Sequence, residues 1–99
     1  MNFFERLANS VEGGVYVIAE ACDNHMGSTR MAKALADMAK ACGADAVKFQ
    51  HHLVTEEMLE NELSTDNFDV SLSEFLHENA LTLQQHYEIK EHCDAIGVT

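Results

Sequence analysis

Two short runs of strand-forming residues flank a helix-forming segment near the start of the chain, and this order limits the fold more than any other feature. Residues 15–20 (VYVIAE) are β-branched, aromatic and almost wholly apolar, which is typical of a strand buried on both faces. Residues 44–50 (ADAVKFQ) form a second run of this kind. The segment of residues 15–50 has the length of one strand–helix–strand crossover, which predicts two parallel strands with a right-handed connection.

The helix between the two runs is marked at both ends. Ser28 is a suitable N-cap, and Gly43 is a suitable residue just beyond the last turn. Apolar residues recur between them at helical spacing and are expected to pack in the core: Met31, Leu35, Met38, Ala39 and Cys42.

The segments outside this unit carry weaker signals. Residues 1–14 are a lead-in segment that fits either a short amphipathic helix or an irregular stretch, and two glycines separate it from the first strand. Residues 51–70 are polar and acidic, which indicates a loop with one helical turn near residues 56–60. Residues 15–99 are therefore interpreted as one domain that follows the lead-in segment.

Two capping-box patterns predict helices in the last third of the chain. SLSE (residues 71–74) opens a short helix, and TLQQ (residues 82–85) opens a longer one that Gly97 closes. The chain then ends on residues 98–99, where a third strand is expected to start. Because a parallel sheet needs both faces buried, the sequence predicts the N-terminal portion of a larger α/β protein, truncated before its third strand.

Charge and composition narrow the function classes. The chain has 17 acidic and 6 basic residues, and a net charge of -11 disfavours binding to nucleic acid or to an anionic membrane. No apolar run is long enough for a membrane span, and the first residues do not form a secretory signal. The three cysteines fit neither a disulfide framework nor a CxxC metal site, so reduced thiols and a cytoplasmic location are expected.

The carboxyl ends of the two predicted strands carry the candidate catalytic and binding residues. Glu20 ends the first run, and Lys48 and Gln50 share one face at the end of the second. Enzymes with parallel α/β sheets place their chemistry at this end. A lysine in a buried strand needs a partner, so Glu20 is expected to pair with Lys48 and an anionic substrate is the expected ligand. The alternative is a structural ion pair without a catalytic role.

Histidines cluster in the sequence near the same strand ends. Four polar side chains follow the two strands and are interpreted as residues at a site mouth, with a metal site as the weaker alternative: Asp23, His25, His51 and His52. Three more histidines fall among polar neighbours on predicted helices and are expected to be solvated: His77, His86 and His92.

Several motifs in order resemble the sialic acid synthase family. The family opens on a pattern close to I-A-E-x-x-x-N-H-x-G, then a helix, then G-A-D-A-V-K-F-Q, and residues 18–50 (IAEACDNHMGSTRMAKALADMAKACGADAVKFQ) follow it. Residues 67–76 (NFDVSLSEFL) and 81–98 (LTLQQHYEIKEHCDAIGV) resemble the next segments. The resemblance implies the N-terminal portion of a (β/α)8 TIM barrel, with about two βα units plus helices. An antifreeze-like domain commonly follows that barrel.

The family resemblance also implies a reaction. Phosphoenolpyruvate would condense with an N-acetylmannosamine-type sugar, or its 6-phosphate, to give a nine-carbon 2-keto acid and phosphate. A divalent metal, manganese or magnesium, would polarise the aldehyde of the sugar. The family's metal ligands would lie beyond Thr99, so no metal ligand is expected in this chain. A homodimer is expected for the full-length form.

Residue roles follow from the same resemblance. Glu20 and Lys48 would be catalytic: Lys48 would neutralise phosphoenolpyruvate, and Glu20 would orient Lys48 or manage a proton or water. Gln50 and Asn67 would bind substrate, with Asn67 on the sugar. Two further matched positions would shape the loop after the first strand: Asn24 and His25.

Departures from the pattern leave alternatives open. His51 and His52 stand where the family often has threonine, and residues 21–23 (ACD) replace a stretch that usually contains glycine. Legionaminic and pseudaminic acid synthases share the opening motifs, so another phosphoenolpyruvate-condensing barrel is one alternative. The other is a small non-catalytic acidic module that binds a partner through its uncovered sheet. The 99-residue chain alone is expected to be inactive, because the later strands of the barrel carry most of the phosphate-binding residues.

Overall fold

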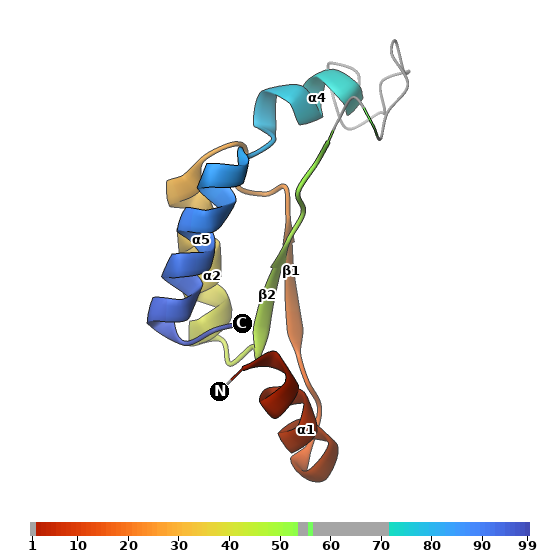
Figure 1. Ribbon diagram of the computed structural model, residues 1–99, viewed down its shortest axis with the longest axis vertical. Helices are drawn as coiled ribbons and strands as arrows, with labels where there is room; N and C mark the ends of the chain where they lie inside the picture. Colours follow the sequence, from red (N-terminus) through yellow and green to blue (C-terminus); the bar gives the residue numbers. More distant parts are fainter. Residues whose placement is uncertain (1, 54–55, 57–71) are drawn as a thin grey trace.

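The computed structural model describes residues 2–53, 56 and 72–99 of the chain (Figure 1). Its elements follow one another in this order: α1 (Phe3–Gly13), β1 (Ile18–Cys22), α2 (Thr29–Ala41), β2 (Ala46–Phe49), α4 (Leu72–Asn79) and α5 (Leu83–Ile96). Most of the expected loop of residues 51–70 lies outside the described residues. Glu56 is described and helical, and the rest of its predicted turn is not described.

The two strands form the predicted parallel pair. Ile18 lies opposite Ala46 and Glu20 lies opposite Lys48, and the register shifts between Glu20 and Cys22. β1 begins and ends later than the run of residues 15–20 that predicted it. The reason is that the ladder needs a partner strand, and β2 begins only at Ala46.

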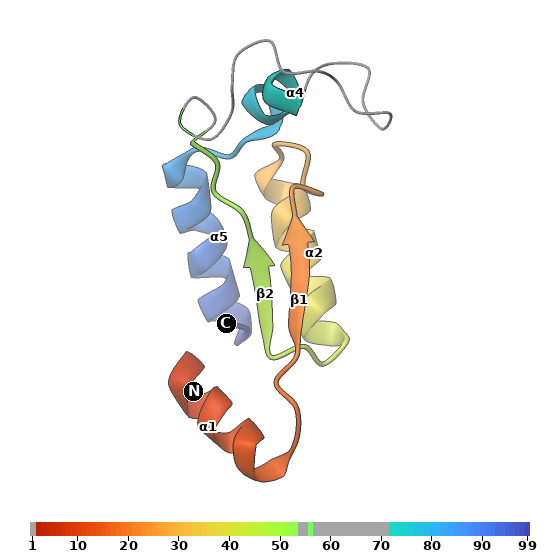
Figure 2. The same cartoon turned by 90° about the vertical axis from the view of Figure 1, so that its right-hand side faces the viewer.

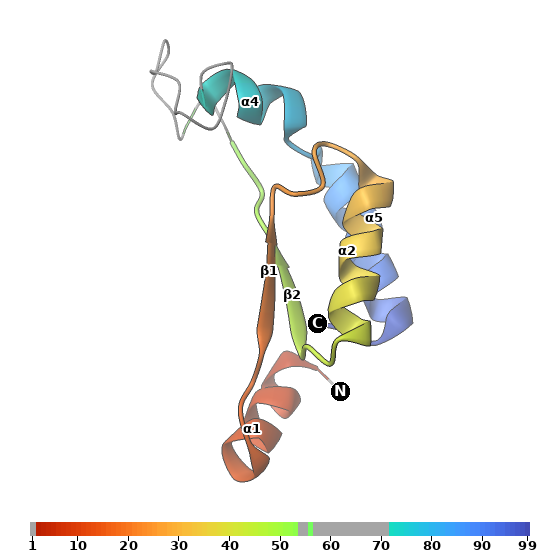
Figure 3. The same ribbon diagram turned by 180° about the vertical axis from the view of Figure 1, so that it is seen from behind.

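Helices α2 and α5 lie side by side on the same face of the sheet (Figures 1 and 3). The predicted caps of these two helices are present, whereas Ser71 of the other predicted capping box lies outside the described residues. Ser28 Oγ accepts a hydrogen bond from Met31 N at 3.1 Å, and Thr82 and Gln85 form a complete capping box. The core between the helices and the strands consists of buried residues together with three partly buried ones: Ala32, Ala36, Leu81, Ile89, Cys93 and Val98, with Val47, Phe49 and Ile96.

The methionines of α2 are not in that core, and this prediction was wrong. Met31 and Met38 are exposed, whereas Ala32, Ala36 and Ala39 are buried. Both stripes have helical spacing, so the sequence alone does not say which one faces the sheet. The alanine stripe faces the sheet and α5, because small side chains let the helix approach closely.

The segment at Thr99 pairs with β2 in the pattern of parallel strands, next to the two-stranded sheet of β1 and β2. Val47 N donates a hydrogen bond to Thr99 O at 2.8 Å, and Thr99 N donates one to Asp45 O at 3.3 Å. Gly97 ends α5 with a left-handed φ of 82°, which turns the chain back toward the sheet. Val98 is then buried in the core. The order along the sheet is therefore β1, β2 and the segment at Thr99.

The lead-in segment is a helix. Asn2 Oδ1 accepts a hydrogen bond from Glu5 N, and Glu5 Oε2 accepts one from Asn2 N, both at 2.9 Å. This reciprocal pair has the pattern of a capping box. The ring of Phe3 packs edge-on against Tyr16, with ring centroids 5.7 Å apart. Helix α1 lies at the amino ends of the strands, opposite α4 at their carboxyl ends (Figure 2).

Only one face of the two strands is covered by the helices of the described chain. Val17 and Ile18 are about half exposed, although the apolar run predicted a strand buried on both faces. Figure 2 shows the strands in front of α2 and α5, with none of the described helices in front of them. The uncovered face carries Glu20 and Lys48.

Candidate functional site

Glu20 and Lys48 meet at the carboxyl end of the sheet. The parallel register places them directly opposite each other, and Lys48 Nζ lies 3.2 Å from Glu20 Oε2. Glu20 Oε1 also accepts a hydrogen bond from Cys22 N at 2.9 Å, so the irregularity at the end of β1 holds the carboxylate. The predicted pairing is therefore confirmed.

The prediction that this pair is buried was wrong for the part of the chain that the structure describes. The side chain of Lys48 is 62% exposed and that of Glu20 is 44% exposed. Both point away from the helices, onto the uncovered face, and an ion pair in this setting contributes at most about 1 kcal/mol. Stability alone therefore gives little reason for a lysine and a glutamate at this position.

The structure describes some, but not all, of the other residues predicted at the site. Gln50 follows β2 directly and is half-buried. Asn67 lies outside the described residues. Asn24 is exposed in the turn after β1, where its backbone N–H donates to Ala21 O at 3.1 Å.

The turn after β1 is compact. Met26 N donates to Asp23 O at 3.1 Å, and Ser28 N donates to His25 O at 3.0 Å, so that the turn leads directly into the N-cap of α2. Cys22 and Met26 have positive φ values of 50° and 52°, which are unusual for residues with a side chain. Such conformations persist only where the surrounding contacts require them.

His25 is the centre of this turn. It is 1% exposed, and its Nδ1 accepts a hydrogen bond from Gly27 N at 3.0 Å. Since Nδ1 is the acceptor, the proton of the neutral ring is on Nε2. This Nε2 has no hydrogen-bond partner among the described residues and lies 4.0 Å from Asp23 Oδ1. Burial lowers the pKa of His25, and the nearby Asp23 carboxylate partly opposes that effect.

Asp23 is held by His52. The Nε2 atom of His52 lies 3.0 Å from each carboxylate oxygen of Asp23. The two side chains are only 12% and 16% exposed. This contact joins the turn after β1 to the segment after β2. The sequence placed both residues after adjacent strands, which is the same reasoning that predicted Glu20 with Lys48, but the pair itself was not predicted.

His86 also faces this cluster, and its predicted solvation was wrong. Its ring centroid lies 4.7 Å from that of His51, and its Nε2 is buried without a hydrogen-bond partner among the described residues. Burial lowers the pKa of His86, and the neighbouring histidines His51, His25 and His52 lower it further. The cause is that α5 begins beside the strand ends, which places its first turn against the segment after β2.

The remaining histidines lie elsewhere. His77 on α4 is exposed, as expected. His92 is not simply solvated, because its Nε2 lies 2.6 Å from Asp37 Oδ1 on α2. This contact links α5 to α2 at a distance of 55 residues in the sequence.

The cluster does not have the geometry of a metal centre. Within residues 2–53, 56 and 72–99, no three His, Cys, Asp or Glu side chains come together as metal ligands would. The weaker interpretation of Asp23 and its neighbouring histidines as a metal site is therefore not supported. Cys22, Cys42 and Cys93 are free thiols, as expected, and burial raises the pKa of Cys93.

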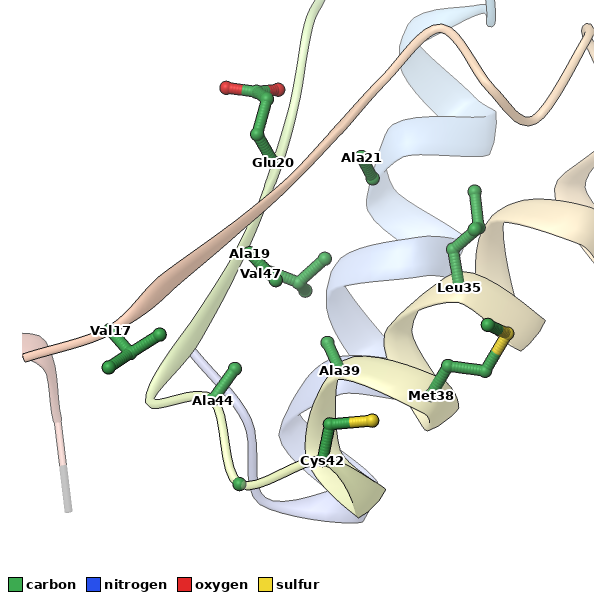
Figure 4. Close-up of a pocket in the computed structure, with 11 residues that line it drawn as sticks. Val17, Ala19, Glu20, Ala21, Leu35, Met38, Ala39, Cys42, Ala44 and Val47 are labelled. Carbon is green, nitrogen blue, oxygen red and sulfur yellow. The ribbon is translucent and has the colours of Figure 1, made fainter.

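A separate apolar hollow lies on the helix side of the sheet. Its volume is about 410 Å³, and it opens between β1 and α2 (Figure 4). Its lining is apolar apart from Glu20, whose carboxylate points away from the hollow in Figure 4. Leu35 and Met38 of α2, with Cys42 at its C-cap, form one wall. Charged ligands do not suit this hollow, so it is distinct from the polar cluster.

None of the helices in the described part of the chain combines the length and the apolar character that a membrane span requires.

Comparison with known proteins matches residues 35–99 to the NeuB family. The chain is 36% identical over 89 residues to the N,N'-diacetyllegionaminic acid synthase of Legionella pneumophila, covering 84% of this chain and 25% of that protein. It is 35% identical over 83 residues to the uncharacterized protein MJ1065 of Methanocaldococcus jannaschii, covering 84% of this chain and 22% of that one.

The chain thus spans about a quarter of the length of these curated relatives. The family match covers α5 and β2 and begins within α2. The two relatives extend the similarity to most of the chain. Together these matches agree with the sequence motifs that end the first strand and continue through GADAVKFQ, and the chain belongs to the NeuB family, a sialic-acid-synthase-like family.

Proposed function

We propose that this chain forms the first βα units of a (β/α)8 barrel that condenses phosphoenolpyruvate with an amino sugar. The topology supports the barrel. β1, β2 and the segment at Thr99 are adjacent, parallel and in sequence order, and both crossover helices lie on one face. A doubly wound sheet has helices on both faces, whereas a barrel has them on the outside only.

The open surfaces also fit this assignment. In a barrel, the face that carries Glu20 and Lys48 becomes the interior, and further strands would cover it. The free edge of β1 and the apolar hollow beside α2 would receive the last strand and helix of the barrel. The half-buried Leu35 and the exposed Met38 would then be buried.

The Glu20–Lys48 pair at the carboxyl end of the sheet is the observation that carries the functional proposal. Lys48 would neutralise the phosphate or carboxylate of phosphoenolpyruvate, and Glu20 would orient the ammonium group or manage a proton or water nearby. Gln50 and Asn67 would hydrogen-bond to substrate, with Asn67 on the sugar. Asn24 and His25 would shape the turn that closes this end.

The proposed reaction forms one carbon–carbon bond. The methylene carbon of phosphoenolpyruvate attacks the aldehyde carbon of the sugar, and the aldehyde oxygen takes a proton. Water then adds to the resulting cation at C2 and loses a proton. The C2–oxygen bond to phosphate breaks, which gives the 2-keto acid and inorganic phosphate.

The acceptor is proposed to be an N-acetylmannosamine-type sugar or its 6-phosphate, with a nine-carbon sialic-acid-type product. A legionaminic-type or pseudaminic-type acceptor is the alternative, and the name of the Legionella relative favours the former of these two. A manganese or magnesium ion and a homodimer remain part of the proposal for the complete enzyme. The described residues do not bring together the ligands of a metal centre.

The test is an assay on the longest reading frame that contains residues 1–99. Phosphate release is followed with phosphoenolpyruvate and each candidate sugar, with manganese present. Lys48→Ala is expected to lower kcat/KM by at least about 10³-fold, because the substrate charge is left unpaired. Lys90→Ala is the matched control: Lys90 also pairs with a carboxylate, Asp94, and is 64% exposed.

The control is expected to retain kcat/KM within about threefold, since an exposed helix pair contributes little. Equal losses in the two variants would contradict a role for Lys48 in the site. Absence of phosphate release with every sugar would overturn the proposed reaction. It would leave the non-catalytic module as the better interpretation.

A further inference from the structure

The contact between Asp23 and His52 is not used by the proposed function, although it lies at the same end of the sheet as Glu20 and Lys48. Asp23 follows β1 and His52 follows β2, so adjacent parallel strands bring them together. The two side chains are mostly shielded from solvent, in contrast to the exposed pair on the strands. A carboxylate–imidazole contact at this place suits proton transfer.

The hydrogen bond determines the state of the His52 ring. Both oxygens of Asp23 lie 3.0 Å from Nε2, so Nε2 carries a proton that it donates to the carboxylate. In the neutral ring, Nδ1 is therefore the nitrogen with the lone pair. A carboxylate in this position orients the imidazole and stabilises its protonated form, as in catalytic triads.

His25 supports Asp23 from the interior. Its Nδ1 is occupied by Gly27 N–H, and its Nε2–H lies 4.0 Å from Asp23 Oδ1 without a hydrogen-bond partner among the described residues. A buried donor without an acceptor is unfavourable, and such a group in a native structure needs an explanation, of which a functional role is one. A small shift of Asp23 would complete the hydrogen bond, so His25 can hold the carboxylate in place together with His52.

We propose that His52 is a proton-transfer residue of the condensation, oriented by Asp23, which His25 retains from the interior. This inference rests on the proposed function. As an imidazolium, His52 donates its Nδ1 proton to the aldehyde oxygen while the carbon–carbon bond forms and the carbonyl π pair moves to that oxygen. The neutral ring then takes a proton from the water that adds to C2. The proton of the resulting C2 hydroxyl leaves with phosphate when the C2–oxygen bond breaks.

Three variants of the longest reading frame test this role. His52→Gln keeps a donor toward Asp23 but cannot exchange a proton, and it is expected to lower kcat by about 10²- to 10³-fold. The KM values for both substrates are expected to stay within about threefold, because binding is retained. His51→Gln is the matched control, since the adjacent ring contacts His86 and not Asp23, and its kcat is expected to stay within about threefold of wild type.

The pH profile of kcat/KM separates proton transfer from a structural role. Among the described residues, the groups that face His52 and its neighbours include Asp23, His25 and His86, with His51 beside it in the chain. The part of the pH profile of kcat/KM that reflects titration of an imidazole is expected to disappear in His52→Gln. In Asp23→Asn the same part of the profile is expected to move to lower pH, because the carboxylate that stabilises the imidazolium is lost.

Each outcome decides the matter. An active wild type in which His52→Gln keeps its kcat and this part of its pH profile overturns the inference and leaves the proposed function intact. Equal losses in His51→Gln and His52→Gln also overturn it. A wild type that releases no phosphate removes the proposed function and the role of His52 together.

Discussion

Two contacts between a carboxylate and a basic side chain lie at the same end of the sheet and differ in their surroundings. Glu20 and Lys48 face each other across the strands, on the open face, and are about half exposed. Asp23 and His52 meet in the segments beyond the strands, beside the helices, and are mostly shielded. The comparison shows that the register of two parallel strands brings the paired side chains together. How strongly the pair interacts depends on how far the neighbouring segments shield it from solvent.

The buried region is expected to respond most strongly to mutation. His25→Ala removes a fully buried ring and the acceptor of Gly27 N–H, and it is expected to lower the free energy of unfolding by about 2–4 kcal/mol. The control His77→Ala, on an exposed face of α4, is expected to change it by less than about 0.5 kcal/mol. Urea unfolding of the longest reading frame measures both. Similar losses would show that the turn does not depend on His25.

Coupling within the two contacts sharpens the comparison. A double-mutant cycle of Asp23→Asn and His52→Gln is expected to give a coupling of about 1–2 kcal/mol, because the contact is charge-assisted and shielded. The cycle of Glu20→Gln and Lys48→Gln is expected to give about 0.2–1 kcal/mol and to weaken with salt. The measurement is urea unfolding at low and high ionic strength. A larger, salt-independent coupling for Glu20 and Lys48 would show that the open face is covered in the protein tested.

Acid is expected to destabilise the fold through the two histidines whose pKa values are lowered, His25 and His86. The pKa values of His25 and His86 are lowered from their ordinary value of 6.5, so the folded protein favours their neutral rings. Above pH 6.5 both states are neutral and this contribution is fully present. As the pH falls through 6.5, the unfolded chain binds protons first and stability is lost.

The check is the free energy of unfolding between pH 8 and pH 5. His86→Gln is expected to flatten part of the decline, since one of the two rings with a lowered pKa is removed. His77→Gln is expected to leave the slope unchanged, because the ring of His77 is exposed. A slope that His86→Gln does not reduce would place the pH dependence elsewhere.

Much of the fold was predictable because its signals are local. Ser28 caps α2, Thr82 and Gln85 cap α5, and Gly97 ends α5. Each of these signals depends on hydrogen bonds within about one helical turn, which the sequence itself brings within reach. The parallel pairing followed from the order of strand, helix and strand, for which few topologies exist.

The site was only partly predictable. The pairing of Glu20 with Lys48 followed from the alternation of side chains along parallel strands. The burial of His25 and the position of His86 did not follow, because histidine among polar neighbours gives no sign of which side of a turn or helix is covered. The predicted packing of Met31 and Met38 in the core was wrong for the same reason. Two stripes of α2 have helical spacing, and only the position of the sheet decides which stripe is buried.

The sequence by itself determined the caps, the parallel strand pair, the meeting of Glu20 with Lys48 and the family motifs, since all of these depend on neighbours or on a strand register. The tertiary structure decided which stripe of α2 is buried, that Asp23 contacts His52 across 29 residues, and that His86 turns toward His51. The physical reason is that burial depends on which elements pack together, and a residue's own neighbours in the chain do not specify that packing.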